Sequence, residues 1–527
     1  MQLTAQQYEI IERSRFMERN SVMKIEACAG SGKTFTLTQI AAANPHKRFL
    51  YLAFNRAIVE SARSKFPQNV TIMTTHALAY RAVVMRFFQG RDIVGMLRPF
   101  DIAPLFGKKS NSELMELLRQ FNNFLHSSER YTNDQQLLQL ISAIEQGAVP
   151  MTHDYYLKLY QVMNDKGLNH FDFILLDEAQ DTNDVTLSIF FDNTCSKIIV
   201  GDSNQSIYGF RGAVNALNKI KADIVHKLSI SFRSNQEILD KANYFVKNYA
   251  RPSIYNQMQA MFDKKTIIGH LYGNEDKAVL TRTNAALIEQ IANISNANLG
   301  KYNLIKNPRD IFLPSIAIFN LMKGDRDKIA PSEAFIRRFR TVLELETYAN
   351  ECKDREILFA IDMAEKYRGQ LFELYERGKK IFNNASAGIV LTNAHQAKGL
   401  EWAHVTLCSD FASLAELKAR ELDLHNSDDN IEYIESQSSL SLVQEANLYY
   451  VAMTRAKVDI IDLTDNDSEY IQFMAGRSHK DVLLQKASDI ARSEKSMAQS
   501  QYKETAHKSR GRKNQHQSAD RFYHQRK

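Results

Sequence analysis

The stretch VMKIEACAGSGKTFTLTQIAAA, residues 22–43, decides the fold. Its first part, Val22–Cys28, is apolar and β-rich and predicts a strand; a loop, Ala29–Gly32, follows, and a helix begins at Lys33. A glycine-rich loop between a buried strand and a helix lets backbone N–H groups approach a phosphate, and the helix N-terminus favours negative charge. The strict pattern G-x-x-x-x-G-K-(S/T) is missed only at its first glycine, where Ala27 stands. The stretch therefore predicts a P-loop in an α/β domain.

A second strand ends in two carboxylates. The stretch FDFILLDEAQD, residues 171–181, places four apolar residues directly before Asp177 and Glu178. Ligands bind at the carboxyl ends of buried parallel strands. We expect Lys33 to reach the β- and γ-phosphates, Thr34 and Asp177 to hold Mg²⁺, and Glu178 to deprotonate the attacking water. Together the two stretches predict Mg²⁺-dependent NTP hydrolysis.

The bulk properties indicate a large intracellular protein. A length of 527 residues suggests three or four domains. Apolar runs stay short of a membrane span, the polar N-terminus lacks a signal-peptide core, and no membrane partner is expected. The four cysteines form no CxxC pair, which argues against a zinc module and favours a reducing compartment, cytoplasmic or with DNA in a nucleoid or nucleus.

Ten apolar, β-rich runs alternate with helical stretches, which is typical of buried parallel sheets. They fall into two groups that divide near residue 225 and predict an α/β fold with two sheet domains. The expected strands are Val22–Cys28, Phe49–Phe54, Val70–Thr74, Phe171–Leu176, Lys197–Val200, Val225–Ile230, Ala278–Thr281, Ile389–Thr392, His404–Cys408 and Asp459–Leu463.

Helical periodicity predicts an insertion in each sheet domain. The first domain takes residues 1–80 and 167–224 around an insertion at 81–166. The second takes 225–287 and 383–475 around an insertion at 288–382. Residues 476–527 carry 13 Lys and Arg against 5 Asp and Glu, are poor in apolar side chains, and are expected to be disordered.

Beyond the carboxylates, VGDSNQSIYGFRG, residues 200–212, adds groups suited to a nucleic acid. Gln205 is placed to sense the γ-phosphate. Tyr208, Phe210 and Arg211 supply two aromatic faces and a cation, a combination that suits base stacking on single strands. Taken alone, aromatic residues in a loop more often serve packing.

The order of these stretches resembles the UvrD/Rep-type helicases of superfamily 1A. The resemblance rests on LTAQQ (3–7), ACAGSGKT (27–34), YLAFNRAIVESA (51–62), TTHALAY (74–80), DEAQD (177–181), VGDSNQSIYGFRG (200–212), LSISFRS (228–234), VLTRTN (279–284), LTNAHQAKGLEW (391–402) and EANLYYVAMTRAK (445–457). It implies two RecA-like domains, 1A and 2A, with insertions 1B and 2B. The chain is most similar to the F-box DNA helicase branch, through HDYYLKLYQ at 153–161 and the AFNRA and THALAY variants, with no F-box expected before Gln7.

The resemblance also implies roles for single residues. Gln7 would read adenine, Phe232 would stack on it, and Glu401 would face the ribose. The loop residues Ala29, Gly30, Ser31 and Gly32, with Lys33 and Thr34, would hold the phosphates and Mg²⁺ of ATP. Gln205, Arg233 and Arg455 would contact the γ-phosphate, the two arginines from the second domain. The DNA-side candidates are Phe54, Asn55, Thr75, His76, Tyr208, Phe210, Arg211 and His395.

On this resemblance we expect an ATP- and Mg²⁺-dependent motor that moves 3′→5′ on single-stranded DNA and opens single-strand/duplex junctions. Two alternatives stay open. One is a translocase that strips proteins from single strands with little unwinding. The other is a DNA-sensing ATPase subunit that regulates a separate partner, such as a recombinase, nuclease or effector.

Overall fold

The computed structural model describes residues 3–53, 56–163, 166–209, 215–250, 256–262, 276–422 and 439–493. Two compact units divide the chain: Met1–Phe411 with Ala446–Leu463, and Ala412–Glu445 with Thr464–Lys527. The larger unit holds two all-parallel sheets flanked by helices, which confirms the expected α/β class with two RecA-like sheet domains. Within the described ranges, no helix combines the length and the apolar character needed to cross a membrane.

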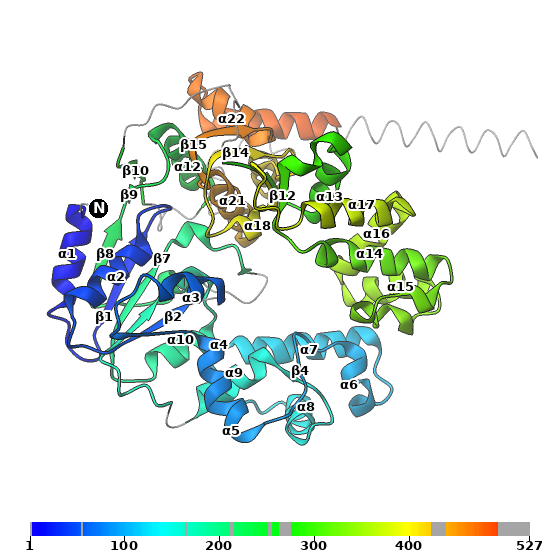
Figure 1. Cartoon of the computed structure of the whole chain (residues 1–527), viewed down its shortest axis with the longest axis horizontal. Helices are drawn as coiled ribbons and strands as arrows, with labels where there is room; N and C mark the ends of the chain where they lie inside the picture. The colour runs from blue at the N-terminus through cyan, green and yellow to red at the C-terminus, as the bar shows by residue number, and fades with distance from the viewer. Residues whose placement is uncertain are drawn as a thin grey trace, which may run out of the picture. The chain divides into compact units, whose positions relative to one another are not determined.

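The first sheet has six parallel strands in the order β3-β2-β6-β7-β1-β8 (Figure 1). Alternate residues of its central strands pack on opposite faces: Tyr51 and Leu175 join the core under α1 and α2, whereas Leu52 and Leu176 join the core that contains α10. Burial on both faces is why these strands read as continuous apolar runs. Their bounds are β1 (Val22–Ala27), β2 (Phe49–Ala53), β3 (Val70–Thr74), β6 (Phe173–Leu176), β7 (Ser196–Gly201) and β8 (Ile224–Leu228).

The helices of this domain begin at polar caps. Thr4 and Gln7 form a reciprocal capping box on α1, and Asn183 caps α10. The helices and helical turns next to the sheet are α1 (Ala5–Ser14), α2 (Lys33–Ala43), α3 (Arg56–Arg63), α4 (Thr75–Ala79), η2 (Ala179–Asp181), α10 (Asp184–Phe191), η3 (Ser203–Gln205) and α11 (Ala216–Lys219).

The first helical insertion follows α4 through a π-helical turn. Its elements are η1 (Tyr80–Val84), α5 (Met85–Phe87), β4 (Ile93–Val94), α6 (Pro99–Phe106), α7 (Asn111–His126), α8 (Gln135–Gln146), β5 (Met151–Thr152) and α9 (His153–Val162). Leu118, Phe121 and Tyr160 lie in one core with Ile174 of the sheet, so the insertion shares its hydrophobic core with the first domain.

The strand β8 differs from the sequence-based division of the chain. It was expected to open the second domain, yet it pairs with β1 in the first sheet, with Met23 beside Ile224 and Ala27 beside Leu228. The chain crosses to the second domain only after β8, through β9 (Ile230–Ser231), which pairs with β10 (Gln259–Ala260). Periodicity identified the strand but carries no information on which sheet supplies its partner.

The second sheet has five parallel strands in the order β12-β13-β11-β14-β15. They are β11 (Lys277–Thr281), β12 (Tyr302–Leu304), β13 (Ile389–Asn393), β14 (Trp402–Leu407) and β15 (Ala456–Asp462). The edge strand β12 was not among the expected strands, because three residues are too few for a periodic signal; it extends the sheet into a stretch expected to be helical. The helices next to this sheet are α12 (Gln236–Tyr249), α13 (Asn284–Asn293), α18 (Ala394–Ala397) and α21 (Leu440–Met453).

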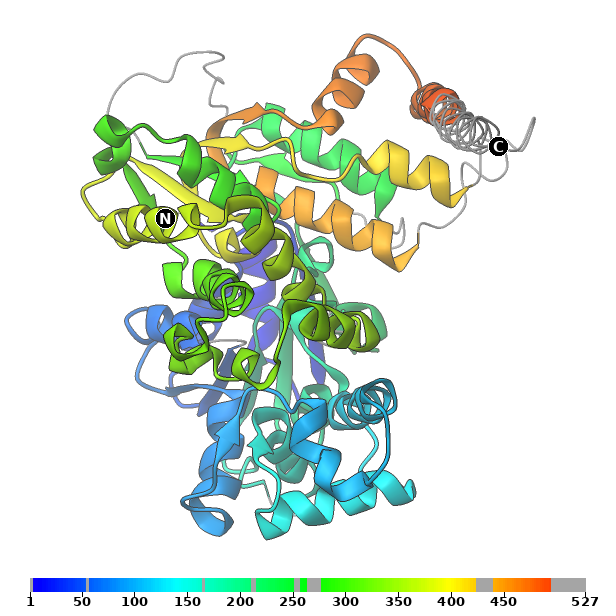
Figure 2. The same cartoon turned by 90° about the vertical axis from the view of Figure 1, so that its right-hand side faces the viewer.

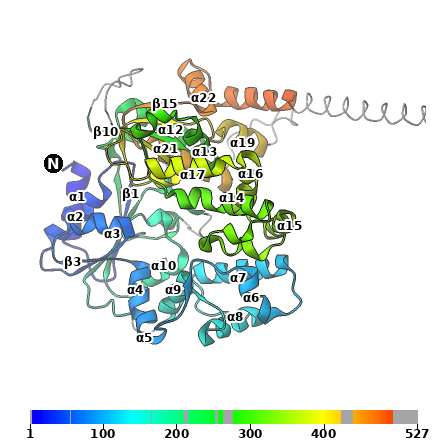
Figure 3. The ribbon, with the colours of Figure 1, turned by 45° about the vertical axis from the view of Figure 1, so that its right-hand side comes forward.

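The second insertion is helical and touches the first. Its helices and turns are η6 (Asn296–Lys301), α14 (Pro308–Met322), η7 (Arg326–Lys328), η8 (Pro331–Glu333), η9 (Ile336–Arg338), α15 (Val342–Cys352), α16 (Arg355–Tyr367) and α17 (Gln370–Ile381). Figure 3 shows α15 beside α7. The ring of Phe335 stacks on Phe100 of α6 at 5.0 Å between centroids, and Arg98 lies 4.2 Å over Phe335.

The second unit contains α19 (Leu414–Glu421) and α22 (Asp465–Met474), followed by a helical segment at 479–493. In Figure 2, α22 is drawn in dark orange and this segment in red. Val482, Leu483 and Ile490 are buried against Ala415 and Ala419. This corrects the expectation of disorder for residues 479–493, whose sparse apolar side chains gather on one face; residues 494–527 lie outside the described part.

Candidate functional site

The P-loop connects β1 to α2 through two glycines in the left-handed region, Gly30 at φ 72° and Gly32 at φ 78°. A Cβ atom at Gly30 would stand 2.6 Å from both the Cβ of Arg233 and the Oγ of Ser231. The N–H of Phe232 also donates to the Gly30 carbonyl at 2.9 Å. The loop therefore needs glycine at this position both for its backbone conformation and for the close approach of the segment that carries Arg233.

The two carboxylates meet the loop where the sequence placed them. The hydroxyls of Thr34 and Tyr51 donate to Asp177 Oδ2 at 2.9 and 2.7 Å. Lys33 Nζ lies 3.6 Å from Glu178 Oε1. Glu178 has φ 53°, a left-handed conformation that is unfavourable for a non-glycine residue and is frequent at functional sites. The predicted phosphate, metal and base residues thus form one cluster.

The charges within this cluster set its protonation. Burial pushes the pKa of Glu178 upward, but Lys33 and Lys398 outweigh burial and hold this pKa at about 2. Burial and the neighbouring Glu178 raise the pKa of Asp177, so Glu178 is the more acidic of the two. Burial alone would lower the pKa of Lys33, yet the surrounding carboxylates raise it. At neutral pH Glu178 is an ionised carboxylate, the form that can accept a proton from water.

The sensor candidate Gln205 lies in η3, just after β7, and is buried. Its Nε2 donates to Asp202 Oδ2 at 2.8 Å. Its carbonyl accepts from Lys398 Nζ at 2.7 Å, and the same ammonium donates to Asp181 Oδ2. Gln205 is therefore linked to the carboxylate cluster through Lys398, which lies between α18 and β14 of the second domain.

The arginine candidates contact protein oxygens. Arg233 Nε donates to Glu401 Oε2 at 2.8 Å, and its NH1 donates to the Thr454 carbonyl at 3.0 Å. Arg455 is 1% exposed, and its guanidinium donates to the carbonyls of Val451 and Leu400. Burial, with Arg233 nearby, lowers the pKa of Arg455 to about 9. Two predicted ligand residues, Arg233 and Glu401, thus pair with each other.

The adenine-side candidates flank the loop. Gln7 is buried, and its Nε2 donates to Thr36 Oγ1 at 3.3 Å and approaches the Ser31 carbonyl at 3.5 Å. The ring of Phe232 comes within 3.9 Å of a Cβ built on Gly32. Gln7 and Phe232 therefore stand on the same part of the P-loop, as a shared base contact requires.

Several site residues were missed from the sequence. Four of them hydrogen-bond to a predicted site residue: Tyr51 to Asp177, Asp202 and Lys398 to Gln205, and Tyr450 to Ala29. Asp202 follows strand β7 and could have been found by the strand-end rule that located Asp177. The other three lie inside quoted stretches, but nothing in their spacing distinguishes them from core residues.

The DNA-side candidates fall into two places. Tyr208 OH donates to the His395 carbonyl at 3.2 Å, and Lys398 Nζ lies 5.3 Å over the Tyr208 ring. Thr75 and His76 begin α4 on the first domain. The remaining four candidates, Phe54, Asn55, Phe210 and Arg211, lie outside the described residues.

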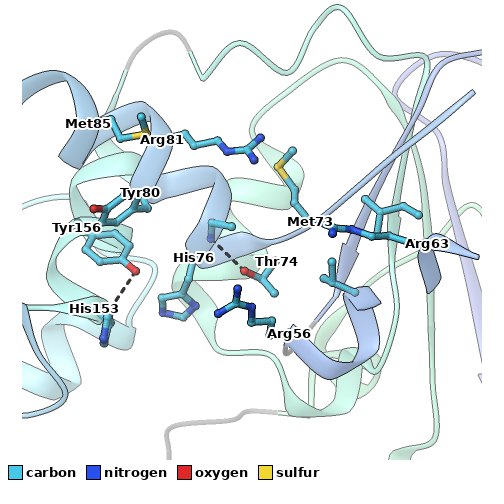
Figure 4. Close-up of a pocket in the computed structure, with 13 residues that line it drawn as sticks. Arg56, Arg63, Met73, Thr74, His76, Tyr80, Arg81, Met85, His153 and Tyr156 are labelled. Carbon is cyan, nitrogen blue, oxygen red and sulfur yellow. Dashed lines mark hydrogen bonds between the residues drawn. The ribbon is translucent and has the colours of Figure 1, made fainter. Parts of the chain in front are cut away.

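A groove of about 860 Å³ lies beside His76. Figure 4 shows the guanidiniums of Arg56 and Arg63 at one side of the groove and Arg81 and Tyr80 at the other. The described residues that line it include three arginines and no carboxylate. Such a surface attracts a polyanion.

Comparisons with known proteins agree with this geometry. Residues 96–224 match the UvrD/REP helicase N-terminal domain, and residues 337–461 match the UvrD-like helicase C-terminal domain. F-box DNA helicase 1 of Gallus gallus is 27% identical over 534 residues, covering 90% of this chain and 50% of the relative. F-box DNA helicase protein 1 of Schizosaccharomyces pombe is 28% identical over 519 residues, covering 87% and 57%.

A third relative, the mitochondrial ATP-dependent DNA helicase HMI1 of Saccharomyces cerevisiae, is 26% identical over 294 residues, covering 46% of this chain and 40% of its own. The chain spans about half the length of the two F-box helicases that it matches. Two matched family domains, each overlapping one of the parallel sheets, support the resemblance read from the motifs. Residues 96–224 and 337–461 therefore carry the N- and C-terminal domains of UvrD-like helicases.

Proposed function

We propose that this chain is an ATP-driven DNA motor that moves 3′→5′ along single-stranded DNA and separates duplex at a junction. The observation that carries the proposal is the joining of catalytic groups from both sheets. Lys33 and Glu178 belong to the first sheet domain, and Lys398 of the second domain lies 3.8 Å from Glu178 Oε2. A site built from two domains can couple hydrolysis to their relative motion.

The donor set fits Mg²⁺. Thr34 and Asp177 offer a hydroxyl and a carboxylate at the phosphate end of the loop. Asp181 Oδ1 is buried and has no hydrogen-bond partner among the described residues. Over the same residues, no cluster of three or more His, Cys, Asp or Glu could hold a metal by itself. Mg²⁺ usually keeps several waters and takes one or two carboxylates plus substrate phosphates, so Thr34 and Asp177 can supply the protein's share of its ligands.

Thr34 and Asp177 would hold the ion, which neutralises charge on the phosphates when bound. Lys33 would bind the β- and γ-phosphates of ATP. Glu178 would orient the attacking water and accept its proton, and its low pKa keeps the carboxylate ionised at neutral pH. Gln205, Arg233 and Arg455 would contact the γ-phosphate, which requires Arg233 to leave Glu401.

The DNA would lie along Thr75, His76, Tyr208 and His395. The groove beside His76 supports this path, because its arginines can neutralise phosphates and Tyr80 offers a partly exposed ring for a base. The 3′→5′ direction rests on the resemblance alone.

Paired variants test the site. Lys33→Ala should abolish hydrolysis, and Glu178→Gln should bind a fluorescent ATP analogue normally while losing turnover. Full DNA-stimulated hydrolysis by Glu178→Gln would show that another group is the base. Strand displacement on duplexes with 3′ or 5′ tails measures direction and unwinding; DNA-stimulated hydrolysis without displacement of naked duplex would favour the protein-stripping translocase.

A further inference from the structure

The phenol of Tyr450 connects the two sheet domains at the nucleotide site. Its oxygen accepts the N–H of Ala29, the residue before Gly30 in the P-loop, at 3.1 Å. Its hydroxyl donates to Asp202 Oδ2 at 2.9 Å. The same carboxylate oxygen receives Nε2 of Gln205 at 2.8 Å. One hydroxyl from the second domain thus bonds to the phosphate loop and, through one carboxylate, to the γ-phosphate sensor.

These contacts are sealed from water. Ala29 and Tyr450 are each 1% exposed, Asp202 is 2% exposed and Gln205 3%. The sulfur of Met258, also buried, lies 3.3 Å from the phenol oxygen and offers only a weak alternative acceptor. Water therefore cannot replace the hydroxyl without a local opening, and the strength of the contacts depends on the two domains keeping their present separation.

Helix α21, which carries Tyr450, is followed in the chain by Arg455, one of the two candidate γ-phosphate arginines. Asn447, one turn earlier on α21, donates from Nδ2 to the Ser206 carbonyl at 3.0 Å, directly after Gln205. Residues three apart lie on one face of a helix, so Asn447 and Tyr450 seat the same face of α21 on the first domain. Arg455 follows the end of α21 and donates back to the Val451 carbonyl at 2.8 Å. The contacts of Asn447 and Tyr450 with the first domain therefore determine the position of Arg455 relative to the P-loop.

We propose that Tyr450 is an interdomain positioning residue that links cleft closure to Gln205 and Arg455 through its hydroxyl. The proposal rests on the ATPase function proposed above. Closing the cleft forms the bonds to Ala29 and Asp202, which orients the amide of Gln205 and brings Arg455 up with α21. Opening the cleft breaks both bonds together, so the sensor loosens as the domains separate. Tyr450 itself touches no reacting atom.

The test is Tyr450→Phe, with Tyr449→Phe as the matched control. Tyr449 is an equally buried phenol on the same helix, but its hydroxyl donates to Asp462 of the second domain rather than to the P-loop. In the full chain we expect Tyr450→Phe to lower the kcat of DNA-stimulated ATP hydrolysis by about 5- to 150-fold, the range of typical coupling between sites. The KM for ATP should change less than kcat, because the hydroxyl bonds to Ala29 and Asp202 and not to Lys33 or Thr34.

Non-additivity separates positioning from packing. In a Gln205→Ala background, Tyr450→Phe should lower kcat by a smaller factor than in the wild-type background, because the link through Gln205 is already lost and only the link to Arg455 remains. Tyr449→Phe should leave kcat unchanged in both backgrounds. Independent multiplication of the two losses, or an equal kcat loss in Tyr449→Phe, would overturn the proposal.

If Tyr450→Phe does not fold, Asp202→Asn tests the same link from the other side, since it keeps the side-chain volume but replaces one acceptor oxygen by a donor. An unchanged kcat in Asp202→Asn would then overturn the proposal, and a loss of kcat at constant KM would support it. Wild-type protein without ATPase activity would instead defeat the proposed function. Active wild type together with a fully active Tyr450→Phe would defeat this inference alone.

Discussion

Replacing Gly30 by alanine should inactivate the ATPase while leaving the protein folded. The backbone at Gly30 has φ 72°, and an alanine there costs about 1–2 kcal/mol in conformational energy. The added Cβ would stand 2.6 Å from the Cβ of Arg233 and from Ser231 Oγ, where ordinary contact begins at 3.4 Å. The segment that carries Arg233 must therefore move by at least the difference, close to an ångström. A displacement of about 1 Å in a catalytic group can cost about 10²-fold in rate.

Gly90→Ala is the matched control. Gly90 has φ 76°, nearly the same conformation, but a Cβ there would meet nothing within 4 Å. Thermal unfolding should show a loss of stability from backbone strain in both variants, and a larger loss in Gly30→Ala because of the clash. Only Gly30→Ala should lose about 10²-fold in the kcat of DNA-stimulated ATP hydrolysis. Near-normal kcat in Gly30→Ala would refute the steric reasoning. An equal loss in Gly90→Ala would attribute the effect to backbone strain.

Two further predictions concern the DNA side and the pH response. The double variant Arg63→Gln, Arg81→Gln should reduce the slope of log affinity for single-stranded DNA against log salt by about 1.4, since each lost phosphate contact removes about 0.7. Arg86→Gln, an exposed arginine of α5 outside the groove, should leave the slope unchanged, and an unaltered slope in the double variant would exclude the groove from the DNA path. Burial raises the pKa of Asp181 to about 6 against the pull of Lys398, so falling pH should protonate Asp181 near pH 6 and weaken its bond to Lys398. ATPase activity should therefore fall as the pH drops through about 6. If the pH–rate profile of Asp181→Asn still shows this fall, another group is responsible for it. Glu178 cannot be that group, because its pKa is about 2.

The sheets were predictable because most of their strands share one sequence pattern, a short run of apolar residues. Every expected strand except the edge strand Val70–Thr74 contains buried residues, and its apolar run could be read directly. Strands that are short or joined across the chain were not readable. Tyr302–Leu304 has too few residues for a period, and the pairing of Ile224–Leu228 with β1 depends on a partner about 200 residues away.

The residues of the site likewise include some that could be predicted from the sequence and some that could not. Lys33, Thr34, Asp177 and Glu178 were found because each follows a strand end or a glycine-rich loop. Lys398 was not found, because its role comes from Asp181 and Gln205, which belong to the other domain. Its sequence neighbours suggest only a loop. Contacts between domains leave no local pattern, and only the folded structure or a family resemblance can assign them.

The position of Arg233 determines how far this arginine can move when the two domains close. The sequence placed Arg233 in the second domain with Arg455, so both were expected to move when the cleft closes. In the structure the segment after β8 bonds to both sides: the Phe232 N–H donates to Gly30 of the P-loop, and Ser234 Oγ donates to the Ala456 carbonyl of β15. Arg233 therefore stands at the crossover between the domains, held to the P-loop by its neighbour, whereas Arg455 belongs wholly to the second domain.

A residue tied to both domains moves less on closure than one tied to the far domain. Arg455 moves with α21, so its distance to the nucleotide depends on closure of the cleft. Arg233 is the arginine that a bound γ-phosphate would attract away from Glu401. Arg233→Ala should then impair hydrolysis in both open and closed states. If DNA binding favours closure of the two domains, Arg455→Ala should impair chiefly the increment that DNA adds. Equal loss of basal and DNA-stimulated ATPase in the two variants would contradict this division of roles.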